Sequence, residues 1–404
     1  MAEAAKEEKK EEKAKVGDDI DLSKIKVAEL HETLKKNEYP AKEIGDEKCT
    51  SLMGKYATKE LFEEYKDKKT GNGFTFAQCI NTGVKNQRSL MGCHAGDIES
   101  YTLYGKFFDS VINDYHNFDV TKKKHPTGDV MDAAKLKNKL TQDSCKRILS
   151  TRIRVARNLT GHALAPGQKS IEEKKKIEEV FKKVFEFINK SDDEKYADFK
   201  GQYYGLYEIS EEQRQGFIAD HFLFKGNDKM QADSGYHNWF PQARGIYFNH
   251  KKTFLCWINE GDHLRIISME KDDKGDVVSV FNRLSKAQQY IQEIMVSQKF
   301  CEGGFMKNDT LGHITCCPTN LGTGLRGGVH IKLEKLAKKS MDDLNEVAIK
   351  FHCQIRGIHG EHSESEGGIL DISNKYRLGY SENELVDFMI AGVNEFVKME
   401  NEEK

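Results

Sequence analysis

The sequence predicts an α+β protein with a helical N-terminal part and a larger part built on a largely antiparallel sheet. Two observations support this class. From Leu22 to about Tyr115, apolar residues recur at helical spacing and strand-like alternation is almost absent. From Cys145 onward, strand-like and helix-like segments mix without the strict alternation that indicates a parallel sheet.

The N-terminal region divides into a tail, a helical domain and a linker. The tail is rich in Lys, Glu and Ala with almost no large apolar side chains, so we expect it to be solvated. Short amphipathic runs such as Thr58–Tyr65 follow, with a break at Lys69–Gly73, and the charged stretch Thr121–Gly128 contains proline and glycine. The predicted division is a disordered tail over 1–20, a helical domain over 21–117, a linker over 118–144 and a larger domain over 145–404.

The larger domain shows strands and two marked helix starts. Segments that read as strands are Ile148–Val155, Ile246–Phe248, Thr253–Ile258, His263–Met269 and Val329–Leu333. Ser170 and Glu173 have the spacing of a capping box, which predicts a helix through Ile188. Ser381 and Glu384 predict a last helix in the same way.

Composition excludes several classes of function. The net charge of −2 gives no global attraction to nucleic acid or to an anionic membrane, and no apolar run approaches the length that spans a bilayer. The acid-rich N-terminus argues against a transit or secretory peptide, and Ala2 stands where myristoylation requires glycine. The 9 cysteines lack regular spacing, which is typical of reduced thiols in the cytoplasm. Without CxxC or HExxH, we expect no zinc site.

The most informative stretch is Cys317–His330, which places a thiol, a glycine run, an arginine and a histidine together. Glycines let backbone amides approach an anion, and arginine offers a forked charge for phosphate. Gly322–Gly327 also fits the dinucleotide pattern GxGxxG, but a strand-like segment follows where that fold needs a helix. A protein-kinase reading fails as well, because the chain contains no HRD and no DFG.

Arginines recur among apolar, strand-like segments. They are Arg152, Arg154, Arg265, Arg326 and Arg356, and we place Arg326 in the glycine loop. A single arginine on a strand is usually a solvated residue, whereas several beside apolar runs suggest convergence. Like charges that converge need a polyanion, and a nucleoside triphosphate meets that need.

Other candidates have an ordinary structural interpretation beside the functional one. His221 and His330 are either structural histidines or rings that flank a base. Cys317 is either inert packing or a thiolate favoured by nearby amides and arginines. Glu361 lies between glycines in a long loop of the kind that forms active-site lids.

From about Ser51 to the C-terminus, the chain resembles the phosphagen (guanidino) kinases, and among them most closely the arginine kinases. Cys317–Gly324 is similar to the signature of that family. Further segments match in order: Ser150–Arg154, Asp220–Phe224, Asn259–Arg265 and Gly360–Glu364. The resemblance implies a small all-helical N-terminal domain and a larger domain with an antiparallel sheet flanked by helices. It also implies reversible transfer of the γ-phosphoryl group of MgATP to a guanidino nitrogen, with ATP/ADP and L-arginine as partners.

The resemblance assigns roles to residues. The phosphates of ATP would be bound by Arg152, Arg154, Arg265, Arg326 and Arg356, and Ser150 would also bind ATP. His221 and His330 would line the adenine pocket. Cys317 would contact the guanidinium as a thiolate, and Glu361 would hold it from the lid. Mg²⁺ would arrive with the nucleotide, so no protein metal ligands are expected. Arginines and Mg²⁺ neutralise the oxygens in phosphoryl transfer, and a carboxylate or thiolate accepts the proton of the acceptor.

Gly261 departs from the family pattern. Arginine kinases usually carry a second glutamate there, which also holds the guanidinium. Gly261 reads as a turn residue between two strands, and Glu260, Asp262 or Glu361 alone would have to serve. We therefore predict a slow enzyme, because losing one aligning carboxylate costs about 10²-fold.

The substrate-specificity loop also differs from that of the arginine kinases. Its predicted contact residues are Leu90, Met91, Gly92, Cys93 and His94. Leu90 and Met91 are bulkier than the usual pair, His94 replaces a tyrosine, and Ala95–Asp97 is more similar to creatine or lombricine kinases. Glu361 within its Gly-Glu-His-Ser segment favours arginine, although His359 replaces a usual arginine. A taurocyamine- or lombricine-type kinase, a catalytically degraded nucleotide-binding relative and a protein-arginine kinase stay as alternatives, the last disfavoured by the helical domain.

Overall fold

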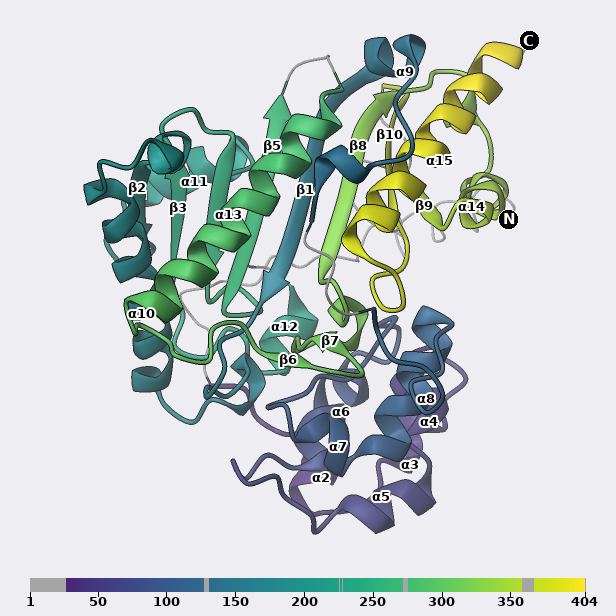
Figure 1. The fold of residues 1–404 in the computed structure, drawn as a ribbon. Helices are drawn as coiled ribbons and strands as arrows, with labels where there is room; N and C mark the ends of the chain where they lie inside the picture. The colour runs from purple at the N-terminus through teal and green to yellow at the C-terminus, as the bar shows by residue number, and fades with distance from the viewer. Residues whose placement is uncertain are drawn as a thin grey trace.

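The computed structural model describes residues 27–126, 131–224, 226, 228–271, 275–357 and 367–403. The chain forms a small helical domain and a larger domain with one broad sheet, stacked one on the other (Figure 1). The tail predicted over 1–20 lies outside the described residues. Within the described part of the chain, no helix is long and apolar enough to cross a membrane.

The small domain contains helices but no strand in its described part, residues 27–117. Its helices are α2 Glu32–Lys35, α3 Ala41–Ile44, α4 Leu52–Tyr56, α5 Lys59–Tyr65, α6 Phe76–Lys85, α7 Ser100–Leu103 and α8 Gly105–His116. The chain breaks between α5 and α6, as the glycines near residue 70 predicted. An aromatic core holds these short helices together: the ring centroids of Phe76 and Phe107 are 5.1 Å apart, and those of Phe76 and Tyr104 are 5.4 Å apart.

The segment between the two domains packs against the larger one. It contains a 3₁₀ turn, η2 Ala133–Lys135, and the start of α9 Gln142–Arg147. The backbone amides of Lys137 and Asn138 donate to Asp387 Oδ1 at 2.9 and 2.8 Å. The segment is therefore tied to the C-terminal helix along part of its length.

The larger domain is built on an eight-stranded antiparallel sheet with β1 near its centre, in the order β2-β3-β4-β5-β1-β8-β10-β9. Its strands are β1 Ile148–Arg157, β2 Gly201–Gly205, β3 Gly245–Asn249, β4 Phe254–Ile258, β5 Leu264–Lys271, β8 Leu325–Lys332, β9 Cys353–Gly357 and β10 Ile369–Asn374. A short hairpin, β6 Lys307–Asn308 and β7 Gly312–His313, lies outside it. The predicted strands are confirmed, but β8 begins at Leu325, so Arg326 lies on a strand and not in the glycine loop.

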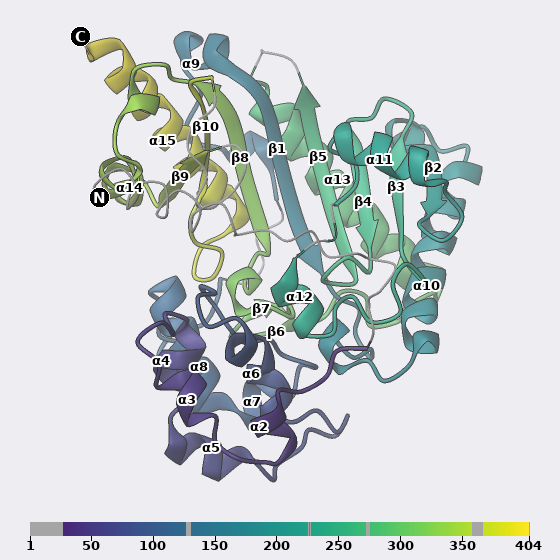
Figure 2. The same ribbon diagram turned by 180° about the vertical axis from the view of Figure 1, so that it is seen from behind.

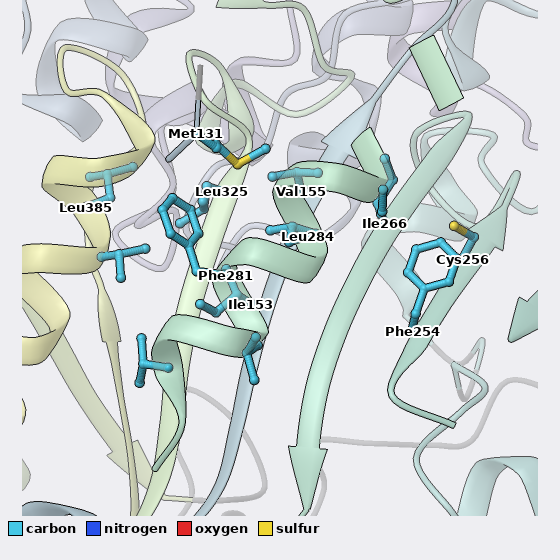
Figure 3. Close-up of a cluster of buried hydrophobic side chains, with 14 of the residues drawn as sticks. Met131, Ile153, Val155, Phe254, Cys256, Ile266, Phe281, Leu284, Leu325 and Leu385 are labelled. Atoms are coloured by element: carbon cyan, nitrogen blue, oxygen red, sulfur yellow. The ribbon is translucent and has the colours of Figure 1, made fainter. Parts of the chain in front are cut away.

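Long helices cover one face of the sheet. They are α10 Ile171–Lys190, α13 Val277–Ser297 and α15 Glu382–Glu402, and they lie in front of the sheet in Figure 1. Ile153 and Val155 of β1 pack on this side with Phe281 and Leu284 of α13 (Figure 3). Alternation along β1 sends Arg152 and Arg154 to the opposite face, which Figure 2 shows from behind. Shorter helices, α11 Glu211–Ala219, α12 Lys229–Asp233 and α14 Met341–Lys350, complete the domain.

The two predicted capping boxes have different outcomes. At α15, Ser381 Oγ accepts from the Glu384 amide at 3.3 Å and Glu384 Oε2 accepts from the Ser381 amide at 2.8 Å, which confirms the box. At α10 the helix begins after Ser170 as predicted, but the Ser170 side chain makes no cap hydrogen bond. The box is wrong there because Glu173 Oε2 accepts instead from the Lys169 amide at 3.3 Å.

Candidate active site

The predicted arginines gather on the face of the sheet that the long helices leave free. Arg152 and Arg154 come from β1, and Arg265 from β5. Arg326 from β8 stands directly opposite Arg154 in the strand register. Arg356 comes from β9 and joins the others through the second of two adjoining cavities.

The first cavity has a volume of about 270 Å³ and a basic wall. It is lined by Ser150, Thr151, Arg152, Arg154, His221, Met269, Lys271, Arg326, Gly328, His330 and Asp371. Ser150 pairs with His330 across β1 and β8, and His330 pairs with Asp371 across β8 and β10. The predicted residues Ser150, His221 and His330 therefore share one cavity with three of the arginines.

The second cavity, of about 420 Å³, adjoins the first at Arg154 and Arg326, which line both. It is lined by Thr82, Leu90, Met91, Gly92, His94, Tyr115, Arg154, Asp228, Met230, Gln231, Tyr236, Gly261, Asp262, Arg265, Cys317, Thr319, Asn320, Arg326, Gln354, Arg356 and Arg377. The loop that carries Cys317, the predicted specificity loop of the small domain and four of the arginines therefore meet here. Cavities of these volumes are typical of sites for small molecules.

Positive charge is in excess at the junction of the cavities. Burial, and then the charges of Arg265 and Arg326, hold the pKa of Arg152 at about 10 and push that of Arg154 well below its usual value. Within the described residues, the buried Nε and Nη2 atoms of Arg152 have no hydrogen-bond partner. Donors of this kind fit a bound anion, since an unpaired buried guanidinium is otherwise costly.

Two side chains that the sequence analysis missed hold the arginines in place. Asp371 of β10 accepts from Arg326 Nη2 and, at 3.3 Å, from Arg356 Nε. Trp257 of β4 stacks its ring against Arg152 and Arg265, whose central carbons lie 5.2 and 5.5 Å from the ring centroid. These contacts fix the direction of the guanidinium groups before any ligand binds.

Gly261 lines the second cavity, and its backbone does not require glycine. The left-handed residue of this turn is Asn259, with φ +55°, whereas the φ of Gly261 lies outside the left-handed region. A Cβ at position 261 would meet Tyr236 Cε2 at 3.5 Å and Gln231 Nε2 at 3.7 Å, which are ordinary contacts. The interpretation of Gly261 as a turn residue therefore does not explain the glycine, and the site has room for a side chain there.

The acids beside Gly261 are already engaged. Glu260 Oε1 accepts from Gln231 Nε2 at 3.2 Å, and Glu260 Oε2 lies 3.3 Å from Arg265 Nη2. Asp262 Oδ1 accepts from Asn158 Nδ2 at 2.7 Å and from the Cys316 amide at 2.9 Å. Neither acid is positioned to take the place of a side chain at 261 without breaking these contacts.

The predicted specificity loop reaches the second cavity with four of its five residues. Leu90 is 52% exposed at the mouth, and Met91, Gly92 and His94 line the wall, whereas Cys93 is fully buried and does not line the cavity. Burial lowers the pKa of His94 to about 3, so its ring is neutral at pH 7. The ring centroid of His94 lies 5.0 Å from that of Tyr236 in the larger domain.

Cys317 lies in the second cavity, and its role as a thiolate towards the guanidinium stays a prediction. Burial raises the pKa of the Cys317 thiol to about 11, even though the Thr319 hydroxyl, whose oxygen is 3.1 Å from the sulfur, favours the thiolate. Arg377, which also lines this cavity, lowers the pKa less than burial raises it. The loss of hydration therefore decides the protonation state.

Both domains hold the segment that carries Cys317. From the small domain, the Tyr101 hydroxyl donates to the Thr315 carbonyl at 2.7 Å and the Ala95 amide donates to the Cys316 carbonyl at 2.8 Å. His116 Nε2 lies 2.9 Å from the Pro318 carbonyl oxygen. From the larger domain, Asp262 accepts a hydrogen bond from the Cys316 amide. The segment that carries Cys317 therefore lies at the interface between the two domains.

Two of the residues named from the sequence are not among those that the structure describes. Glu361 and His359 lie outside the described residues. Among the residues that the structure does describe, no group of three or more His, Cys, Asp or Glu side chains could hold a metal ion.

Comparison with known proteins agrees with this architecture. The family model for the N-terminal domain of ATP:guanido phosphotransferases matches residues 47–113, and the model for their C-terminal catalytic domain matches residues 177–403. The chain therefore belongs to the ATP:guanido phosphotransferase family, which joins a small helical domain to a catalytic domain on an antiparallel sheet.

Several relatives carry the name arginine kinase. One from Penaeus vannamei is 43% identical over 354 residues, covering 88% of this chain and 94% of the relative. One from Anthopleura japonica is 43% identical over 372 residues and covers 91% of this chain, but this chain spans only 49% of that relative.

Solved structures of similar fold carry other names. The substrate-free duplicated taurocyamine kinase from Schistosoma mansoni has a TM-score of 0.79 and 37% identity, covering 92% of this chain and 50% of that chain. A lombricine kinase has a TM-score of 0.77 and 34% identity, covering 88% of this chain and 93% of that one. The family is common to all of these relatives, whereas the guanidino substrate named differs.

Proposed function

We propose that this protein is a phosphagen kinase that transfers the γ-phosphoryl group of MgATP reversibly to the guanidino group of L-arginine. The observation that carries the proposal is the adjoining pair of cavities, which arginines from four strands line and which share Arg154 and Arg326, with Cys317 in the second cavity. Converged cations with unsatisfied donors suit a triphosphate, and a cavity that continues past them suits an acceptor in line with it.

In this proposal the first cavity holds the nucleoside and the junction holds the phosphates. His221 and His330 flank the base, and Ser150 lies beside Arg152 in the same cavity. Arg154 and Arg326 line both cavities, so they would contact the phosphoryl group as it passes from donor to acceptor. Mg²⁺ would come bound to ATP and neutralise phosphate oxygens that the arginines do not reach.

The second cavity holds the acceptor. Cys317 would donate or accept at the guanidino group, and Leu90, Met91, Gly92 and His94 would bound the rest of the substrate. Glu361 would contribute a carboxylate from its loop, as the resemblance implies. The absence of a side chain at Gly261 is the reason to expect turnover about 10²-fold below that of an enzyme with a carboxylate at that position.

A taurocyamine- or lombricine-type acceptor is the second candidate. The solved structures of similar fold bear those names, and His94 gives the loop a neutral ring where arginine kinases usually carry tyrosine. A coupled assay of ADP release with arginine, taurocyamine, lombricine, creatine and no acceptor tests both candidates. We expect the highest kcat/KM with arginine. A higher value for another guanidine would reassign the substrate, and no acceptor-dependent release would reject the kinase activity.

A further inference from the structure

We propose that Asp228 is the carboxylate that holds the acceptor guanidinium, and takes its proton, on the side where Gly261 offers no side chain. This inference rests on the proposed phosphoryl transfer. Asp228 is the N-cap residue of α12, and it lines the second cavity together with Cys317 and Gly261. A cationic acceptor in that cavity needs an acid within reach, because it must lose a proton to become a nucleophile.

The other nearby acids are committed elsewhere. Asp228 and Asp262 are the carboxylates among the described residues that line this cavity. Asp262 is buried and bound to Asn158 and the Cys316 amide, and it supports the Cys317 segment through that amide. Glu260 does not line the cavity and lies against Arg265. Of these three acids, Asp228 is therefore the one that can bind a ligand without breaking the contacts of Asp262 with Asn158 and Cys316 or of Glu260 with Arg265.

Local structure presents the Asp228 carboxylate in a defined direction. Its Oδ1 caps α12 by accepting from the amides of Met230 at 2.8 Å and Gln231 at 3.1 Å. One oxygen is thereby fixed, and Oδ2 is the atom that an acceptor would meet. The side chain is partly buried, so a charge-assisted hydrogen bond made there would be stronger than one in bulk water.

Gln231 joins Asp228 to the position of the missing side chain. The Gln231 amide bonds Asp228, and its Nε2 would lie 3.7 Å from a Cβ at position 261. The same Nε2 donates to Glu260 at 3.2 Å, which keeps the Gln231 side chain between the two acids. The space above Gly261 is thus bounded on one side by Gln231, which contacts Asp228, so we expect a guanidinium that fills the space to approach that carboxylate.

The proton transfer balances without another reactant. A guanidinium N–H donates its proton to Asp228 Oδ2, and the lone pair left on nitrogen attacks the γ-phosphorus. The bond from phosphorus to the bridging oxygen breaks, and ADP leaves with that electron pair. Burial, and secondarily the nearby charge of Glu260, raise the pKa of the Asp228 carboxyl, which makes it a stronger base than an exposed aspartate.

The test is Asp228→Asn, since asparagine caps a helix as well as aspartate does but cannot accept the proton. We expect kcat with the guanidino acceptor to fall by about 10²-fold, with KM for ATP and the melting temperature unchanged. The matched control is Asp276→Asn, because Asp276 Oδ1 caps α13 through the Ser279 amide in the same way and does not line either cavity. The control should retain full activity.

A double variant distinguishes a catalytic role of Asp228 from a purely structural one. If Asp228 stands in for the side chain absent at 261, Asp228→Asn should cost much less when combined with Gly261→Glu than it does alone. The acidic limb of the kcat/KM profile for the acceptor should also change in Asp228→Asn. An active wild-type protein with an unaffected Asp228→Asn variant, or strictly multiplicative effects, would overturn the inference alone. A wild-type protein inactive with every acceptor would reject the proposed function itself.

Discussion

The two cavities are built in contrasting ways. The first is framed mostly by strands of one sheet, and several of its polar residues follow the ladder: Ser150 stands opposite His330, and His330 opposite Asp371. The second takes its wall from a loop of the small domain, the start of α12, the turn at Gly261 and the segment at Cys317. Under the proposed function, a rigid sheet suits the polyanion in the first cavity, whereas the proposed acceptor wall, made of separate loops, can change one part at a time.

We expect the largest effect from removing a positive charge where the two cavities meet. We expect Arg154→Met to lower kcat/KM by about 10³-fold, the lower end of what an arginine contributes to phosphoryl transfer. Because Arg152, Arg265 and Arg326 disfavour the charge on Arg154, its removal should not lower the melting temperature. Steady-state kinetics and calorimetry check both outcomes.

The control for that variant is Arg214→Met. Arg214 lies on α11 and pairs with Glu211 at 2.8 Å, away from both cavities. It should leave the kinetics unchanged. A marked loss of stability in Arg154→Met, with activity retained, would mean that the arginine cluster is structural.

In the second cavity, by contrast, we expect a substitution to raise turnover. Gly261→Glu should raise turnover by about 10²-fold, since the position has room for a side chain and the backbone does not need glycine. Gly261→Gln is the matched control, equal in size but without charge, and should give little of the gain. No rise in kcat for the glutamate variant would reject the account of Gly261 as a lost catalytic group.

Cys317 allows a test by pH in the ligand-free protein. Because burial raises the pKa of its thiol to about 11, the thiol is protonated at neutral pH and the thiolate fraction grows as the pH rises towards that value. Alkylation of Cys317 by iodoacetamide, followed by mass spectrometry, should therefore be slow at pH 7 and speed up throughout the range from pH 8 to 10. A rate that is already maximal at pH 8 would contradict this prediction, and Cys317→Ser identifies the modified peptide.

The smallest predicted effect is the stabilisation of the protein by ligands that bind without reacting. Tripolyphosphate at about 100 times its dissociation constant should stabilise the protein by about 2.7 kcal/mol. L-Arginine at the same concentration should stabilise it less, since we expect it to bind more weakly than the polyanion. Thermal shift assays at matched concentrations compare the two, and a larger shift with L-arginine would contradict this expectation.

The sequence predicted the first cavity better than the second. Alternation along Ile148–Val155 was enough to place Arg152 and Arg154 on one face, because strand periodicity is local. Asp371 and Trp257 were missed, since their roles depend on which strands lie side by side and no local pattern encodes that order. Arg326 was assigned to the loop because the glycines conceal where β8 begins.

The acceptor wall was harder to predict for a related reason. Tyr236 and Asp228 reach the cavity only because α12 packs against the small domain, and neither lies in a recognisable motif. The interpretation of Gly261 as a turn residue was reasonable from sequence, but the left-handed conformation falls on Asn259. The pKa of the Cys317 thiol is raised by burial, and burial depends on the whole fold and not on the local sequence.

The hydrogen bonds that Tyr101, Ala95 and His116 make to the backbone around Cys317 have a consequence for how such enzymes could be recombined. Replacing the helical domain with a foreign one would replace both the hydrogen-bond donors that position the backbone next to Cys317 and the loop that we propose to select the substrate. A chimera designed to switch acceptors should therefore carry over Tyr101 and His116, or their partners at Thr315 and Pro318, as one unit.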